Sequence, residues 1–99
     1  MSEDLQLRQE LDRASRAQAL LNDELLREAI DTLRARISDD LFSSPVRDTE
    51  GRERLWLMHR LLASVEGHLK TLVETGKMAS LQLERKRSLK DKARELLAW

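Results

Sequence analysis

A run of apolar residues at heptad spacing constrains the fold of this chain more than any other feature of its sequence. The run, hereafter the seam, consists of Leu55, Met58, Leu62, Val65, Leu69 and Leu72. Steps of three and four residues keep these side chains on one face of an α-helix, as in the contact line of a coiled coil. The seam therefore predicts a long helix over residues 49–75 with an interface along it.

The composition indicates an all-α fold for the rest of the chain. Leu, Arg, Glu, Ala and Lys dominate, aromatic residues make up only 3% of the sequence, and three Gly and one Pro leave few turns for a strand-rich fold. Ninety-nine residues make a single domain at most, and we assign residues 1–99 to one helical domain.

A phase slip in the apolar pattern divides the first half of the chain. Residues 1–21 carry one apolar stripe, and a second stripe starting at Leu26 is offset from the first by one residue. The slip falls at Asn22-Asp23, where Asn22 is suited to cap a new helix over residues 23–42. A single bent helix is the alternative.

The segment after residue 42 predicts a turn, which we term the corner (Pro45, Asp48, Thr49 and Gly51). Proline cannot donate a hydrogen bond to a continuing helix, and either Asp48 or Thr49 can cap the next one. Gly51 in the first turn would let a neighbouring helix or subunit approach closely. We expect the corner to be structural, without a catalytic group.

Gly76 marks the expected end of the seam helix, because glycine is favoured just beyond a helix C-terminus. Residues 22–76 then form a helical hairpin, followed by a basic helical segment over residues 77–99. A lone hairpin cannot enclose a core, so either the terminal segments fold back into a small bundle or several copies share a coiled-coil-like interface. The near-strict seam favours a homo-oligomer with the six seam residues as its interface.

Charge is unevenly distributed, although the net charge is zero. Residues 1–50 carry 7 basic and 12 acidic side chains, whereas residues 77–99 carry 7 basic and 3 acidic ones. The basic side chains considered for partner contact are Arg85, Lys86, Arg87, Lys90 and Arg94. They could contact nucleic acid or a protein, and the interleaved acids and the absence of an aromatic residue among them favour a protein.

The sequence shows no pattern for catalysis, metal binding or cofactor binding. His59 and His68 are nine residues apart, half a turn out of phase on a helix, so they cannot share a metal ion, and we expect His68 to pack beside the seam. No metal-ligand, phosphate-loop or nucleophile motif is present, and we expect no enzyme activity. The absence of cysteine, of long apolar runs and of a signal-peptide pattern predicts a cytoplasmic protein without a membrane span.

The stretch Arg47-Asp48-Thr49-Glu50-Gly51-Arg52-Glu53, followed by Leu55-Trp56, Gly67-His68-Leu69 and Val73-Glu74-Thr75-Gly76-Lys77, resembles short helical proteins of unassigned role encoded by tailed bacteriophages and prophages. Asn22-Asp23 resembles the start of the first long helix in that group. The likeness covers residues 20–80 and leaves out the basic tail.

This resemblance implies a location in the host-cell cytoplasm or the virion, and three alternative roles. The first is a structural or assembly accessory that docks on phage particle proteins. The second is a DNA-packaging subunit similar to small terminase subunits, with the basic C-terminal helix contacting DNA or the packaging motor, although the helix-turn-helix common in such subunits is missing here. The third is an inhibitor directed at a host protein.

Overall fold

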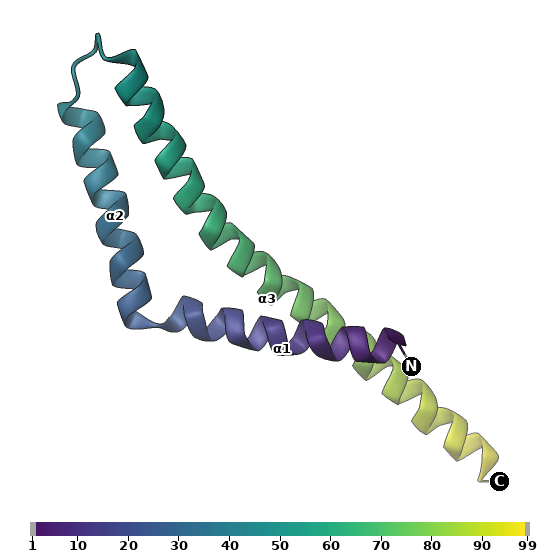
Figure 1. Cartoon of the computed structure of the whole chain (residues 1–99). Coiled ribbons are helices and arrows are strands. Elements are labelled where there is room, and N and C mark those ends of the chain that lie inside the picture. The colour runs from purple at the N-terminus through teal and green to yellow at the C-terminus, as the bar shows by residue number, and fades with distance from the viewer. Residues whose placement is uncertain (1, 99) are drawn as a thin grey trace.

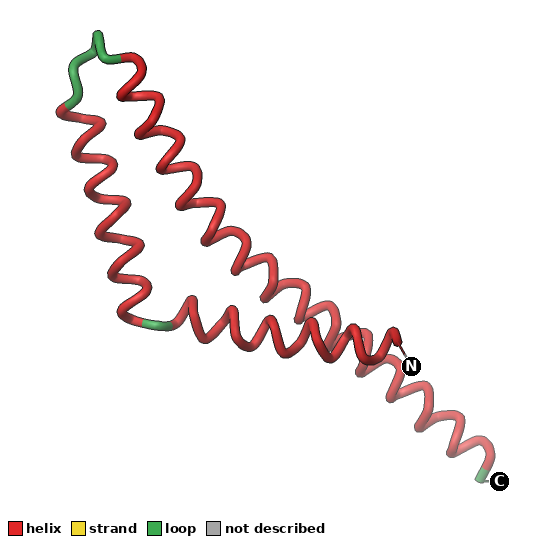
Figure 2. The backbone as a smooth tube through the Cα atoms, in the orientation of Figure 1, coloured by secondary structure: helices red, strands yellow, loops and turns green. Residues whose placement is uncertain are grey.

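The computed structural model describes residues 2–98 of the chain as three helices: α1 (Ser2–Asn22), α2 (Glu24–Ser43) and α3 (Thr49–Leu97). Figure 2 shows that only short connections separate them. The predicted all-α class and the hairpin, formed by α2 and α3, are confirmed. α3 has 49 residues, about 74 Å at 1.5 Å per residue, and it accounts for most of the molecule's 79 Å length.

The elbow between α1 and α2 is the single non-helical residue Asp23. Its backbone is extended, and its carboxylate accepts a hydrogen bond from the Leu26 N–H at 2.8 Å. The predicted break is therefore present, but the capping residue is Asp23. Asn22 is instead the last residue of α1, and its amide oxygen accepts from Gln18 Nε2.

The corner is built as predicted, with Asp48 as the capping residue of α3. The Asp48 carboxylate accepts from the Gly51 N–H at 3.0 Å, and its own N–H donates to the Pro45 carbonyl oxygen. A Cβ on Gly51 would overlap the Asp48 carboxylate. Gly51 thus makes room for its own capping residue, whereas the sequence predicted room for a neighbouring helix or subunit.

Gly76 lies inside α3, so the prediction that a helix ends there is wrong. Residues 77–97 continue the same helix, and no glycine adopts a positive φ. Gly76 is buried because α1 crosses α3 at this level, with Ala14 against it. The absence of a side chain at Gly76 allows the two helices to approach closely. The residues after Gly76 are good helix formers, so the helix continues.

The core lies mainly where α1 folds back along the C-terminal half of α3 (Figure 1). Leu7, Ala14 and Ala17 of α1 are buried there together with Gly76 and Ala79 of α3. Small side chains let the two helix axes approach closely, but each of these residues buries little apolar area. The sequence predicted fold-back as one of two ways to cover the hairpin, and α1 does so over part of its length.

α2 packs on the other half of α3 with less burial. Ile30 and Ile37 are its buried residues, and the space between the α2 and α3 ribbons widens from the corner toward the elbow (Figure 1). Along the chain, α1 diverges from α3 toward the elbow, and α2 then returns to the start of α3 at the corner. The three ribbons therefore outline an open triangle (Figure 1).

None of the three helices is long and apolar enough to cross a membrane, among the residues described.

Candidate functional site

The structure divides the seam into a covered and an uncovered part. Leu69 and Leu72 are half-buried and line one groove with Ala17 and Leu20 of α1. Leu55 and Leu62 are also half-buried, on the side of α3 that faces α2. The side chains of Met58 and Val65, by contrast, are 53% and 52% exposed, so no helix covers these two seam positions among residues 2–98.

The exposed seam residues belong to a wider apolar surface, hereafter the uncovered patch (Leu57, Met58, Leu61 and Val65). Each of these side chains is more than half exposed. Spacings of one, three and four residues place them next to one another on one side of α3. Met58 and Val65 belong to the seam, Leu61 flanks it, and Leu61 is more exposed than either of them.

Two residues close to the seam in the sequence have exposed side chains. Trp56 lies on another side of α3, where its ring stacks under the Arg60 guanidinium at 5.3 Å. His68 is exposed, so the prediction that it packs beside the seam is wrong. His68 is exposed because neither α1 nor α2 lies over its side chain near the elbow.

Exposed apolar side chains also occur outside the patch. Phe42 and Val46 project from the corner end of the hairpin and are 89% and 81% exposed. Met78, Leu81, Leu89 and Leu96 follow the side of α3 that points away from α1, and all are exposed. The chain therefore presents more large apolar side chains to solvent than it buries.

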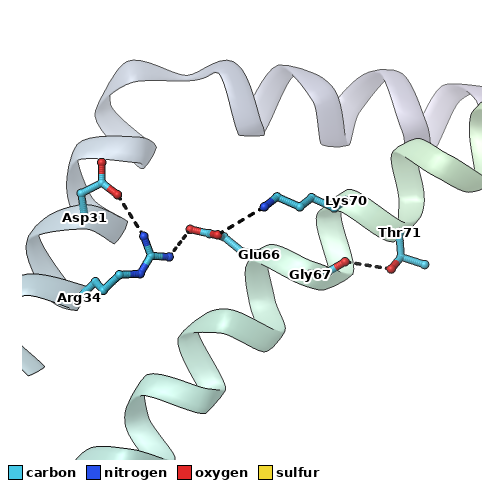
Figure 3. Close-up of polar contacts among 6 residues, drawn as sticks. All are labelled: Asp31, Arg34, Glu66, Gly67, Lys70 and Thr71. Carbon is cyan, nitrogen blue, oxygen red and sulfur yellow. Dashed lines mark hydrogen bonds and ion pairs between the residues drawn. The ribbon is translucent and has the colours of Figure 1, made fainter. Parts of the chain in front are cut away.

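A groove of 420 Å³ lies inside the elbow, lined by residues of all three helices. One charged network bridges it: Arg34 of α2 donates to Glu66 of α3 at 2.7 Å and to Asp31 at 3.3 Å (Figure 3). Lys70 approaches the other oxygen of Glu66 at 3.9 Å. Of these contacts, Arg34–Glu66 joins α2 to α3, and the other two lie within one helix each.

The five basic residues considered for partner contact separate into one paired lysine and four groups without an ion pair among residues 2–98. Lys86 donates to Asp4 at 2.8 Å and lies 3.3 Å from Glu3, both in the first turn of α1. The hydrogen bond from Lys86 lowers the pKa of Asp4, and the same bond raises the pKa of Lys86. The sequence-based prediction placed Lys86 among the partner-contact residues, but its ammonium group is already paired with Asp4 and Glu3 of α1.

The remaining basic residues, Arg85, Arg87, Lys90 and Arg94, are exposed and form no ion pair among residues 2–98. α3 runs past the N-terminus of α1 (Figure 1), and every residue of this C-terminal extension (residues 87–98) is exposed. Arg87, Lys90 and Arg94 share one face at helical spacing. That face continues the side of α3 on which α1 lies.

No cluster of three or more His, Asp or Glu side chains that could hold a metal ion occurs among residues 2–98. The corner residues are engaged in capping, as described above. What the geometry does provide is helix surface, apolar on α3 near its start and cationic near its end.

No protein family, curated protein or solved structure matches this chain.

Proposed function

We propose that this chain is a non-enzymatic helical interaction protein that self-associates through the uncovered patch. The observation that carries the proposal is the exposure of Met58 and Val65 in the middle of an otherwise covered heptad seam. Seam residues are apolar in order to pack against another helix, and no helix of the same chain reaches these two. A second copy supplies one.

The small core supports the same proposal. The buried apolar residues are Leu7, Ala14, Ala17, Ile30, Ile37 and Ala79. Three of these six are alanines, and burial stabilises by about 25 cal/mol per Å² of apolar surface, so the isolated chain gains little. Association through the patch would add the burial that the monomer lacks, as in small domains that depend on oligomerisation.

The setting we propose is that of a structural or assembly accessory in a tailed phage, docking on particle proteins in the host cell or virion. This part rests on the sequence resemblance around the corner and on the shape of α3. The C-terminal extension presents 12 consecutive exposed residues (87–98) at the end of α3. Such an extension can enter a groove of a second protein without unfolding anything else.

A second candidate role is DNA contact by the extension, as in a packaging subunit. The specific observation in its favour is the shared, unpaired face of Arg87, Lys90 and Arg94. If these residues contact phosphates, affinity falls steeply with salt and the triple change to Gln flattens the slope. Salt-insensitive binding, or no binding at low salt, assigns the face to a protein partner. The inhibitor role has no comparable observation.

Self-association is tested by sedimentation of the wild type and of a Met58→Asp/Val65→Asp variant. Both residues are exposed in the single chain, so the variant keeps its helices but loses the apolar contact and sediments as a monomer. Ala63→Asp is the matched control, because Ala63 is exposed on the opposite side of α3 and should leave the mass unchanged. A wild type that is a folded monomer at tens of micromolar contradicts the proposal.

A further inference from the structure

We infer that the partner on the uncovered patch is the N-terminal half of α3 from a second copy, running antiparallel. The inference deepens the proposed self-association by naming the contacting segment and its direction. It rests on the route that α1 takes along α3 and on the position where α1 stops.

α1 already occupies the continuation of the patch. Met58, Val65, Leu72, Ala79 and Lys86 are spaced at seven-residue intervals and follow one face of α3. α1 covers the last three: Leu72 lines a groove with Ala17, Ala79 is buried, and Lys86 pairs with Asp4.

The cover ends at the elbow. α1 stops at Asn22, and α2 leaves in a new direction along a neighbouring side of α3 (Figure 1). Leu72 is therefore half-buried, whereas Met58 and Val65 on the same face remain exposed. The uncovered part of the face is a short stretch of helix surface that lies between the end of α1 and the corner.

This arrangement excludes a parallel pair of α3 helices through the patch. A parallel partner in register would continue along Leu72, Ala79 and Lys86, where α1 already lies. An antiparallel partner meets no such obstacle, because its C-terminal half leaves past the corner while its first turns point toward the end of α1. The two copies then overlap only through their N-terminal halves.

The second copy is also compatible in charge and chemistry. Residues 49–66 carry three acidic and three basic side chains, so two copies of this segment meet without net repulsion. A twofold axis through the patch brings the same surface of both copies together, and twofold symmetry is the commonest symmetry of homodimers. The axis falls close to Leu61, between Met58 and Val65, so that Met58 of one copy faces Val65 of the other.

Single cysteines test the direction, because the chain contains no cysteine of its own. In an antiparallel pair Leu61→Cys faces its own copy near the axis and forms a disulfide-linked dimer on oxidation. Met58→Cys and Val65→Cys are each displaced from their own copy by about 10 Å along the helix at 1.5 Å per residue, and a disulfide requires Cα atoms within about 7 Å. A mixture of these two variants should cross-link, because Met58 of one copy faces Val65 of the other. Ala63→Cys on the opposite side of α3 is the background control.

The expected result is efficient linkage of Leu61→Cys alone and of the mixture of Met58→Cys with Val65→Cys. Linkage of Met58→Cys alone and of Val65→Cys alone indicates a parallel pair, and linkage of no variant, in a wild type that sediments as an oligomer, indicates another contact surface. Either result overturns the inference and leaves self-association standing. A wild type that sediments as a monomer overturns both. Circular dichroism of each cysteine variant, matching the wild type, shows that the helices are intact before linkage is measured.

Discussion

Gly76 of α3 lies against Ala14 of α1 so closely that a Cβ atom added to the glycine would overlap the alanine Cβ. The same atom would lie 3.5 Å from the Glu10 carbonyl oxygen. Neither neighbour is the flexible end of a long side chain, so the helices themselves must separate to admit a methyl group. The two residues mark the closest packing between α1 and α3.

Gly76→Ala should destabilise the protein although alanine is the better helix former. Separating α1 from α3 costs about 1–3 kcal/mol by overpacking, which exceeds the gain in helix propensity of up to about 1 kcal/mol. Gly67→Ala is the matched control, since nothing lies within 4 Å of a Cβ at Gly67 and that change should stabilise. Thermal unfolding followed by circular dichroism measures both, and a stabilised Gly76→Ala variant would contradict the described crossing.

The Asp4–Lys86 pair should hold the first turn of α1 on α3 over a defined pH range. The pKa of Asp4 is lowered in the folded protein, so the stabilisation is present above the ordinary Asp pKa and is lost as the pH falls through the lowered value. The pKa of Lys86 is raised, so the stabilisation is lost at high pH only as the pH rises through the raised value. The pair is therefore intact between about pH 4 and about pH 10.

An NMR titration of the Asp4 carboxyl group measures this coupling directly. In Lys86→Gln the pKa of Asp4 should rise toward its ordinary value, and amide exchange in the first turn of α1 should accelerate at neutral pH. Arg85→Gln removes a neighbouring cation that makes no ion pair with α1 among the described residues, and it should leave both quantities nearly unchanged. An Asp4 pKa unaffected by Lys86→Gln would show that the pair does not form in solution.

The Arg34–Glu66 contact should couple α2 to α3 energetically. A double-mutant cycle with Arg34→Gln and Glu66→Gln is expected to give a coupling free energy of about 1 kcal/mol, because both side chains are partly exposed. Arg27→Gln with Glu66→Gln is the control cycle, since Arg27 lines the same groove but forms no ion pair with Glu66 among residues 2–98. Equal coupling free energies in both cycles would mean that the Arg34–Glu66 value reflects the overall charge of the groove and not a direct ion pair.

Asp48→Ala should shorten the start of α3 and lower stability by about 1 kcal/mol, the typical cost of losing a capping side chain. That loss corresponds to a fall of roughly 4–8 °C in the melting temperature of a domain of this size. Thr49→Ala is the control, because Thr49 is the first helical residue and the capping bond belongs to Asp48. Self-association below the melting temperature should survive in both variants. Loss of association with stability unchanged would instead make the corner a binding site.

The all-α class, the elbow, the corner and the seam could be predicted from the sequence, because each depends on residues close together in the chain, whereas the length of α3 could not. Pro45 and Asp48 define the turn by their own backbone chemistry, and the 3-4 spacing from Leu55 to Leu72 requires only that a helix forms. The offset between stripes at residues 22 and 23 located the elbow to within one residue. The sequence named Asn22 as the capping residue and the structure has Asp23, an error of one position between two adjacent residues that can both cap a helix.

What only the tertiary structure decided is which helix covers which part of α3. The direction in which α1 leaves the elbow depends on packing between Ala14 and Gly76, residues 62 positions apart in the sequence. A glycine near the end of an apolar pattern reads locally as a helix stop, and nothing nearby distinguishes that role from a close crossing. The same long-range choice leaves Met58 and Val65 exposed and covers Leu72, because α1 ends before it reaches them and α2 lies on a different side of the helix.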